Sequence, residues 1–512
     1  MARQPATATL AKRAHPRWPG AVALVVILLA RAALAEPPGP APAITRPPAC
    51  QLEGDADGDI QPIDLPTALQ LAEGSNPLIA LARARVAEAY AHQREAEVAW
   101  LPDLRGGVTY LRHDGEIQNA LGLVFPTSKS SLFVGGGASF SWDLSSVYYG
   151  RLVARRLTDA TAAAAQATDA NVQLDVALAY LDLVREHAAL AINRDTLGRA
   201  EEMLQAARAG DKAGLGKTPA DITRAQAEVQ VRRSERFDIF GQEAVASARL
   251  ARLLHLQPTV RLEPGEPSVV PISLVPMDSP VQELVQTGLQ NRPELREDRS
   301  LLSAAEVRLR QARVAPFVPR LDAGYAAGLF GGGTQSDMSH FDSRGDGTVQ
   351  ATWELHNLGA GDVARTRARR AQVDQAAYAL ADTQARVGAE VVAAARYARY
   401  RYQALPSSQA AIRQALETWR RLQKASFGMA GAKREYDPLE PLLAEQALDQ
   451  ARKNYLNEVI EYNRAQFRLY WAMGQPPLCA LPEARPVPVE VPVVPKEYAK
   501  PDILPPPKVA PE

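Results

Sequence analysis

The longest pattern along this chain is a helical one that runs from Arg151 to Ala209 without a proline. Apolar residues recur within it at steps of three, four and seven, which places them on one face of a helix. The residues of this apolar seam are Val172, Val176, Ala179, Leu183, Leu190, Leu197 and Leu204. A break with glycine and proline follows at 210–219, and a second long helix is predicted from about Ala220 to Leu256.

The second part of the chain repeats this helical arrangement. A helix is predicted over about 362–427, with Pro406 as a candidate interruption. A break at 428–438 follows, and then a helix that ends near Met473. Antiparallel helix pairs of this length cannot bury both faces alone. Their alanine content and heptad-like seams suit coiled-coil packing, so the partner helices must come from the other repeat or from other copies of the chain.

Two short stretches alternate between apolar and polar residues, which is the period of a β-strand. Their apolar members are Phe140, Trp142 and Leu144 in the first stretch, and Val349, Ala351, Trp353 and Leu355 in the second. Their strand partners are expected at 104–112 and 321–329, so each stretch belongs to a hairpin. The segments 113–130 and 331–346 are rich in Gly, Ser, Asp and Asn, and we expect them to be the hairpin loops.

The helices and hairpins form one design that is written twice. Pro77 and Pro293 open equivalent helices 216 residues apart, and Trp142 and Trp353 lie at equivalent strand ends 211 residues apart. A glycine and a basic cluster then open each long helix. These clusters are Gly150-Arg151 onward, and Gly361 followed by Arg365, Arg367, Arg369 and Arg370. The unit is far too long for a solenoid, so we interpret it as a duplicated module with repeats at 63–270 and 271–475.

The two ends of the chain differ from this body. Residues 1–35 have a basic start, an apolar core and Ala33-Leu34-Ala35 at a cleavage position, which predicts a secretory signal peptide. The alternative is an N-terminal anchor, but the apolar core is short for a spanning helix. The flanks 36–62 and 476–512 are expected to be disordered, because 12 of the 37 residues in the second are proline.

Composition excludes some functions. Lys and Arg number 58, as do Asp and Glu, and a zero net charge argues against nucleic acid as a partner. The two cysteines, Cys50 and Cys479, could form a disulfide in an oxidising periplasm, or they could be unpaired thiols in the flanks.

The sequence contains no motif that indicates a catalysed reaction. The segment 211–218 nearly spells a phosphate-binding loop but lacks its first glycine and the preceding strand. Histidines without ligand spacing and acids on helical faces predict no metal, no cofactor and no enzyme.

The alternating strands fit a membrane barrel with its apolar face outward, although a soluble hairpin with one buried face gives the same alternation. Export without a spanning helix after the signal favours the barrel, since only helices and closed barrels cross lipid. The lipid-facing residues would be Phe140, Trp142, Val349 and Trp353. Four strands cannot close a barrel. Three chains would pool twelve, an even number within the known range, although this argument alone does not exclude two or four copies.

These features together resemble the TolC family of outer-membrane efflux proteins over nearly all of 63–475. The marks are Asn76-Pro77, Leu101-Pro102 before a strand, and the Trp-Asp/Glu-Leu strand ends. The resemblance implies an α+β, mainly α fold: a homotrimeric channel-tunnel with four membrane strands per chain, a twelve-stranded barrel and long antiparallel coiled-coil helices. It also implies the outer membrane of a Gram-negative bacterium, with a large periplasmic portion. Its partners would be outer-membrane lipid, a periplasmic membrane-fusion adaptor and an inner-membrane transporter.

The resemblance also implies roles for the two breaks between long helices, which form the periplasmic tip in that family. Candidate adaptor-docking residues are Gly214, Leu215, Gly216 and Asp221 in the first break, and Phe427, Gly428 and Gly431 in the second. Candidate pore-constriction residues are Asp437, Glu440 and Leu443. The alternative for Asp437 and Glu440 is that they are first-turn helix residues favoured by the macrodipole.

The function predicted from the sequence is therefore a passive exit duct of a tripartite efflux or secretion system. The alternative is a periplasmic coiled-coil structural or adaptor protein whose hairpins pair in a soluble sheet. An exported hydrolase is disfavoured, because the chain offers no catalytic constellation.

Overall fold

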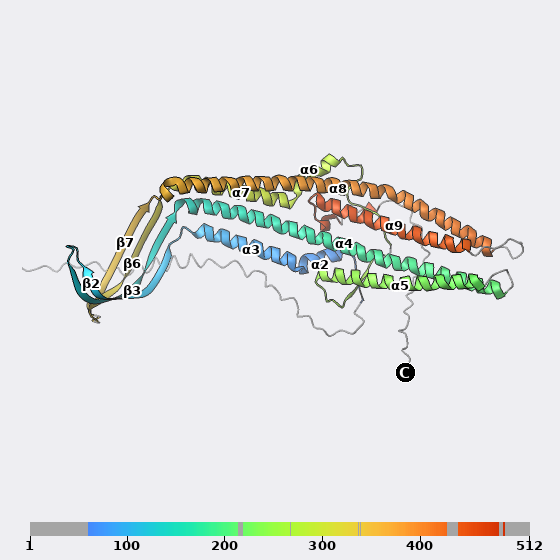
Figure 1. The fold of residues 1–512 in the computed structure, drawn as a ribbon, viewed down its shortest axis with the longest axis horizontal. Coiled ribbons are helices and arrows are strands. Elements are labelled where there is room, and N and C mark those ends of the chain that lie inside the picture. Colours follow the sequence, from blue (N-terminus) through green and yellow to red (C-terminus); the bar gives the residue numbers. More distant parts are fainter. Residues whose placement is uncertain are drawn as a thin grey trace, which may run out of the picture. The chain divides into compact units, whose positions relative to one another are not determined.

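The computed structural model describes residues 60–212, 219–266, 268–335, 337, 339–427, 439–480 and 485–486. These ranges belong to one compact unit, which spans Asp57–Glu512 (Figure 1). The expected signal peptide, most of both expected flanks and Cys50 lie outside the described residues. The pairing of Cys50 with Cys479 therefore stays a prediction.

Six elements of the first half recur in the same order in the second half. In the first half they are α2 (Leu65–Ser75), α3 (Pro77–Val98), β2 (Asp103–Gln118), β3 (Val124–Asp143), α4 (Leu144–Lys212) and α5 (Pro219–Leu254). In the second half they are α6 (Val281–Asn291), α7 (Pro293–Val314), β6 (Arg320–Thr334), β7 (Asp342–Thr352), α8 (Ala360–Phe427) and α9 (Leu439–Ala472). The order is that of the module that the sequence contains twice. The predicted α+β, mainly α fold is confirmed.

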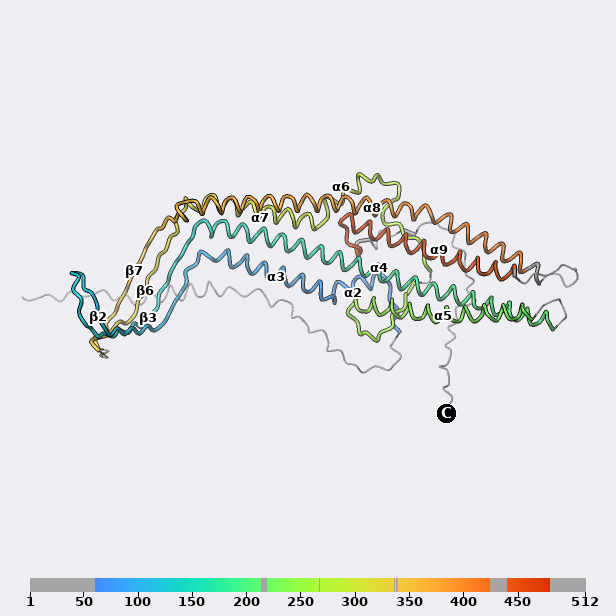
Figure 2. The backbone as a smooth tube through the Cα atoms, in the orientation of Figure 1, coloured from blue at the N-terminus to red at the C-terminus, as the bar shows by residue number. Residues whose placement is uncertain are grey.

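The helices extend from the sheet in one direction. Strands β2, β3, β6 and β7 lie at one end, and the four helix ends Lys212, Pro219, Phe427 and Leu439 lie at the other (Figures 1 and 2). Helix α5 packs antiparallel on α4, and α9 packs on α8. Helix α4 also contacts α3, α7 and α9, so it joins the two halves. The helix was expected to be interrupted at Pro406, but α8 continues through this residue.

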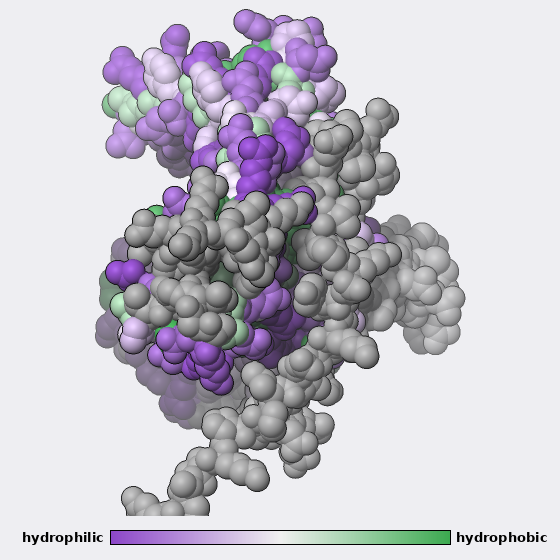
Figure 3. Space-filling model, turned by 90° about the vertical axis from the view of Figure 1, so that its right-hand side faces the viewer, coloured by the Kyte–Doolittle hydropathy of each residue, from purple (hydrophilic) through white to green (hydrophobic). Residues whose placement is uncertain are grey.

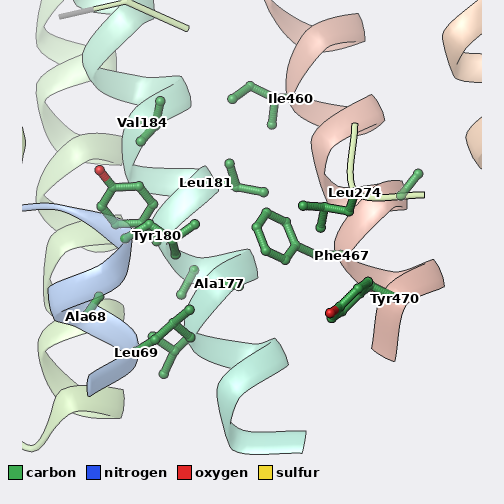
Figure 4. Packing of buried hydrophobic residues seen from close by; sticks show 14 of the residues in the cluster. Ala68, Leu69, Ala177, Tyr180, Leu181, Val184, Leu274, Ile460, Phe467 and Tyr470 are labelled. Carbon is green, nitrogen blue, oxygen red and sulfur yellow. The ribbon is translucent and has the colours of Figure 1, made fainter. Parts of the chain in front are cut away.

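The core lies where α2, α4, α5 and α9 meet, near the middle of the long helices. In Figure 4, Ala177 and Leu181 of α4 point toward Phe467 of α9, and Leu69 of α2 packs beside α4. All of these side chains are buried. Small residues such as Ala177 let the helices approach closely, as the alanine-rich seam predicted.

Several short elements support this core: β1 (Ile60–Ile63), which pairs parallel with β4 (Arg261–Pro264), β5 (Ile272–Ser273), which pairs with β8 (Arg485–Pro486), and the 3₁₀ helix η3 (Pro477–Ala480). Two further 3₁₀ helices, η1 (Ala315–Phe317) and η2 (His356–Gly359), connect α7 to β6 and β7 to α8.

The expectation of disorder from residue 476 onward is wrong for η3 and β8. Leu478 packs on the core and donates its backbone N–H to Gln173, and proline is tolerated in an edge strand such as β8. The ordered body also starts earlier than expected, at Ile60, because β1 pairs with β4.

The strands are longer than expected, and the expected loops 113–130 and 331–346 are mostly wrong. Strand β2 continues to Gln118, β3 starts at Val124, and only residues 119–123 separate them. The Asn119 side chain holds this turn by accepting the N–H groups of Leu121 and Leu123, each at 3.0 Å. Polar and glycine residues therefore extend the hairpin instead of ending it. These residues were expected to form loops because their composition resembles that of a loop.

Candidate functional site

The four-stranded sheet has order β2-β3-β6-β7 and one continuous antiparallel register. Directly paired residues share a face, so the register places Phe140 and Trp142 with Leu321, Ala323 and Val349. The rings of Phe140 and Trp142 meet edge to face at 5.1 Å. The same face continues with further apolar residues: Leu104, Val108, Tyr110, Leu132, Val134, Tyr325, Leu329 and Ala351. Near the helices this face is thus apolar or small across all four strands, whereas its far part on β2 and β3 carries the polar residues Arg112, Asp114, Glu116, Ser128 and Ser130.

The opposite face of the sheet is mainly polar or small. At its helix-proximal end, Ser141 donates to Asp322 at 2.8 Å and accepts from Arg320 at 2.7 Å. Leu111, Ile117, Phe125, Phe133 and Phe330 are exceptions on this face, and Arg344 stacks on the Phe330 ring at 4.7 Å. The two faces therefore differ as the alternation of the sequence predicts.

Trp353 does not belong to the sheet as expected. Strand β7 ends at Thr352, so Trp353 lies just beyond it and is 61% exposed. Trp100 and Phe317, which stand at the equivalent connections between a shorter helix and the sheet, are also exposed. The indole of Trp142 donates to the Trp100 carbonyl at 2.8 Å. Exposed aromatic side chains thus gather where sheet and helices join.

Close backbone approach requires glycine in the middle of the sheet. A Cβ atom on Gly135 would lie 2.5 Å from the Ala327 carbonyl oxygen, and one on Gly328 would lie 2.4 Å from that of Val134. These are backbone contacts that cannot move aside. The paired glycines therefore set how closely β3 and β6 approach.

The far ends of the helices carry the candidate tip residues, only some of which are described. Gly214, Leu215, Gly216, Gly428, Gly431 and Asp437 lie outside the described residues, and Phe427 is described only as the last residue of α8. Asp221 is buried in the first turn of α5, 3.7 Å from Arg224. Glu440 and Leu443 are exposed at the start of α9. Viewed from this end, the described surface is mostly hydrophilic (Figure 3).

A buried network of charges joins α5 to α9 about three to four turns from the tip. Arg232 of α5 donates to Glu228 at 2.7 Å, to Glu235 at 2.9 Å and to Asp449 of α9 at 2.6 Å. Lys453 contacts both Glu235 and Asp449. We call these five residues the α5–α9 charge network. Because Asp449 also accepts a hydrogen bond from Thr196, the network links α4 as well.

Glu445 extends this network and is its least satisfied member. It is 1% exposed, and its Oε2 atom accepts no hydrogen bond although Arg199 lies 3.6 Å away. Burial raises the pKa of the Glu445 carboxyl to about 7, despite the opposing charges of Arg199 and Arg452, and nearby Asp195 and Asp449 add to the rise. Arg199 in turn lies 4.3 Å from the ring of Trp419 in α8. A titrating group thus sits where four long helices meet.

Sequence reasoning missed this network. The available signal was the spacing of Glu445, Asp449 and Leu456 at steps of four and seven, which is that of a buried helix face. Beside it, α4, α5 and α9 border a groove of about 380 Å³ that includes Arg185, Asp238 and Asn457.

Two absences apply to the described part of the chain. None of its helices is long and apolar enough to cross a membrane. Within the same residues, no three His, Cys, Asp or Glu side chains come together as a metal site would require.

Comparisons with known proteins agree with this architecture. The family model described as "Outer membrane efflux protein" matches residues 68–255. No curated protein matches the sequence. Three solved structures share the fold: a membrane protein from Pseudomonas aeruginosa (TM-score 0.67, 21% identity, 83% of this chain and 98% of that chain), VceC from Vibrio cholerae (0.66, 16%, 80% and 96%) and CusC (0.65, 21%, 85% and 98%).

The fold is thus that of TolC-like outer-membrane channels, as predicted. The family match supports the resemblance carried by the sequence motifs, because the model of the outer membrane efflux protein family matches residues 68–255 of this chain. The proteins of this family are channels and not enzymes, in agreement with the prediction that the chain is not an enzyme. The predicted location, the outer membrane with a large periplasmic helical portion, agrees with this family.

Proposed function

We propose that this chain forms the outer-membrane channel of a tripartite efflux or secretion system, and that it is a passive exit duct. The observation that carries the proposal is the sheet at the end of the long helices. The helix-proximal part of one of its faces is rich in exposed apolar side chains. Its edge strands, β2 and β7, are each paired on one side only. Unpaired backbone groups cost several kcal/mol each in lipid, so these edges need partners from other copies.

Three copies are the assembly we propose. Three sheets supply twelve strands, an even number within the range of outer-membrane barrels. Protein extracted in mild detergent should therefore have the mass of a trimer in analytical ultracentrifugation. A stable monomer under these conditions would contradict the proposal.

Membrane fractionation and conductance test the duct directly. The protein should remain in the outer-membrane fraction after carbonate washing, and the purified oligomer should conduct ions in planar bilayers. Release by the wash together with an absence of conductance would instead support the alternative, a periplasmic coiled-coil structural or adaptor protein.

We propose that the apolar face of the sheet contacts lipid. Phe140, Trp142 and Val349 share that face, Trp353 follows it beyond β7, and Ser141 lies on the opposite, lumenal face. Single cysteines at Phe140 and Ser141, in a chain whose Cys50 and Cys479 are replaced by Ser, would test this. An impermeant thiol reagent should label the Ser141 position much faster. Equal labelling would mean that the assignment of the faces is wrong.

We also propose that the far helix ends dock a periplasmic adaptor, through which an inner-membrane transporter delivers cargo. The candidates remain Gly214, Leu215, Gly216, Asp221, Phe427, Gly428 and Gly431. Photocrosslinkers at Gly216 and Gly431 should capture a periplasmic protein in cells, whereas one at exposed Phe237, part-way along α5, should not.

Within the same tip, we propose that Asp437, Glu440 and Leu443 line the pore constriction. The exposed side chains of Glu440 and Leu443 at the start of α9 support this. Three copies of each carboxylate would form a ring that attracts cations. The double variant Asp437→Asn/Glu440→Gln should lose cation selectivity in bilayer recordings, and the matched variant Glu306→Gln on α7 should keep it. Unchanged selectivity in the double variant would leave Leu443 as the remaining candidate.

A further inference from the structure

Both long helices that leave the sheet begin with exposed arginines. Helix α4 carries Arg151, Arg155 and Arg156 within its first four turns, and α8 carries Arg365, Arg367, Arg369 and Arg370 in the equivalent place. We call these seven residues the arginine collar. Six of them are exposed, and Arg369 is half-buried. The collar thus occurs in both halves of the chain.

Local charge pairing does not account for the collar. The two stretches contain one carboxylate each: Asp159 lies 3.6 Å from Arg156, and Asp362 lies 3.7 Å from Arg365. Within the described part of the chain, Arg151, Arg155, Arg367 and Arg370 have no carboxylate at ion-pair distance. The chain as a whole has equal numbers of basic and acidic residues, so this excess of positive charge is local.

Helix stability does not account for it either. Cations are stabilised by the helix macrodipole only near the C-terminus of a helix, and the effect fades beyond the terminal turn. The collar lies near the N-terminal end and beyond the first turn, so the macrodipole does not favour arginine there. This placement suggests an anionic partner outside the chain.

The Cα–Cβ bonds of the collar residues tilt toward the sheet. Each Cα–Cβ bond of an α-helix tilts toward the N-terminus, and both α4 and α8 have their N-termini at the sheet. At 1.5 Å per residue, Arg365 is about 8 Å and Arg151 about 10 Å beyond the start of its helix. A long arginine side chain can cover much of that distance.

Exposed aromatic side chains mark the level to which the collar points. Trp100, Phe317 and Trp353 are 57%, 80% and 61% exposed at three connections between sheet and helices, and Leu358 in η2 is fully exposed. Aromatic girdles of this kind lie at the membrane–water interface of barrels. The polar headgroup layer is about 5–8 Å thick on each side of a bilayer, so the collar would begin where that layer ends.

We propose that the arginine collar binds the phosphate groups of acidic phospholipids in the periplasmic leaflet of the membrane. Guanidinium groups match phosphate oxygens in pairs, and basic residues at a membrane surface attract anionic lipid. This proposal rests on the proposed membrane position of the sheet. The bound lipids would fix the depth of the channel and fill the surface between the aromatic belt and the helices.

Lipid binding by purified protein tests the collar. The wild type, delipidated in detergent and verified to conduct in bilayers, is titrated with short-chain phosphatidylglycerol or phosphatidylcholine and bound lipid is counted by native mass spectrometry. We expect phosphatidylglycerol to bind at least tenfold more tightly, and the preference to disappear in about 0.5 M salt, where screening is nearly complete at a few ångströms. If the wild type does not conduct, the proposed function fails first, independently of this result.

Two sets of variants test the arginines of α4 and those of α8 separately. Arg151→Gln/Arg155→Gln/Arg156→Gln and Arg365→Gln/Arg367→Gln/Arg369→Gln/Arg370→Gln should each lose most of the phosphatidylglycerol preference, while Arg→Lys versions should keep part of it. The matched control replaces Arg386, Arg396, Arg420 and Arg421, which are exposed on the same helix farther from the sheet. An equal preference in collar and control variants would overturn the proposal. So would unchanged lipid binding with altered ion selectivity, because the arginines would then line the lumen.

Discussion

The two halves of the chain reach the same geometry with different side chains, most clearly where a returning long helix ends. In the first half, Asn76 donates to the Leu253 carbonyl at the end of α5. In the second half, Arg292 donates to the Trp471 carbonyl at the end of α9. A neutral amide and a charged guanidinium therefore occupy equivalent places, each directly before the proline that opens the next helix. The duplication preserved the backbone arrangement and allowed the chemistry to diverge.

The divergence has an energetic consequence. Arg292 is 1% exposed, contacts Glu294 and Glu390 at 3.0 Å each, and lies 4.0 Å from the Trp471 ring. Asn76 is buried as well, but it brings no charge with it. The second half thus depends on a buried ion cluster where the first needs only hydrogen bonds.

The largest expected effect follows from that difference. Arg292→Ala should destabilise the protein by about 3–5 kcal/mol, because it removes a buried charge, leaves Glu294 without its partner and leaves Glu390 with Arg386 alone. Asn76→Ala should cost only about 1–2 kcal/mol, since it removes neutral hydrogen bonds. Denaturant unfolding followed by tryptophan fluorescence compares the two. Equal losses of stability would show that the buried charge of Arg292 contributes no more than the neutral hydrogen bonds of Asn76.

The second effect concerns the helix ends near the tip. Counted back from the equivalent residues His255 and Gly474, buried Glu445 of α9 corresponds to exposed Gln226 of α5. Glu445→Gln therefore gives the second half the residue of the first. Because the folded-state pKa of Glu445 is raised to about 7, the ionised carboxylate opposes folding above pH 7.

The sign of the pH dependence follows. As the pH falls from about 7 to about 4.5, the folded state takes up a proton that the unfolded state does not, so the Glu445 contribution to stability increases. Glu445→Gln should stabilise the protein by about 2–3 kcal/mol at pH 8 and by little at pH 5. Thermal unfolding at both pH values measures this. A pH-independent difference would place the titration elsewhere, and Gln226→Glu, at an exposed site, should change neither value.

A third effect separates the two positions that end α5 and α9. Both His255 and Gly474 adopt left-handed backbone conformations, with φ of 57° and 77°. A Cβ atom on Gly474 would lie 2.6 Å from the Arg292 backbone nitrogen, so Gly474→Ala should cost about 2 kcal/mol or more. The test is a shift of the unfolding midpoint. An unchanged midpoint would mean that the Arg292 segment can move aside.

The smallest effect has the opposite sign. His255→Gly should stabilise the protein by about 0.5–1 kcal/mol, because glycine adopts the left-handed conformation without the Cβ penalty that histidine incurs. The variant His255→Ala controls for loss of the imidazole and should not stabilise. A gain with alanine as large as that with glycine would attribute the effect to the side chain and not to the backbone.

The sequence predicted the features that depend on periodicity. The apolar seam of α4 and the alternation around Trp142 identify a buried helix face and a two-faced sheet, because each is fixed by residue spacing alone. It did not predict strand length, since the glycine and serine residues after Leu111 suit a loop and a strand equally. It also missed Glu445, because a charged residue on a long helix looks solvated until the packing partners are known.

The unequal edges of the sheet determine how copies can join. Strand β2 has 16 residues and β7 has 11, so the two edges of one chain are not alike. Contacts that join β7 of one chain to β2 of the next are head-to-tail, and they form a closed ring only when the last copy enters. In the proposed ring, each β2 edge is longer by five residues than the β7 edge that it would pair with. Until closure every intermediate has a free edge, so insertion should depend on chain concentration more steeply than first order.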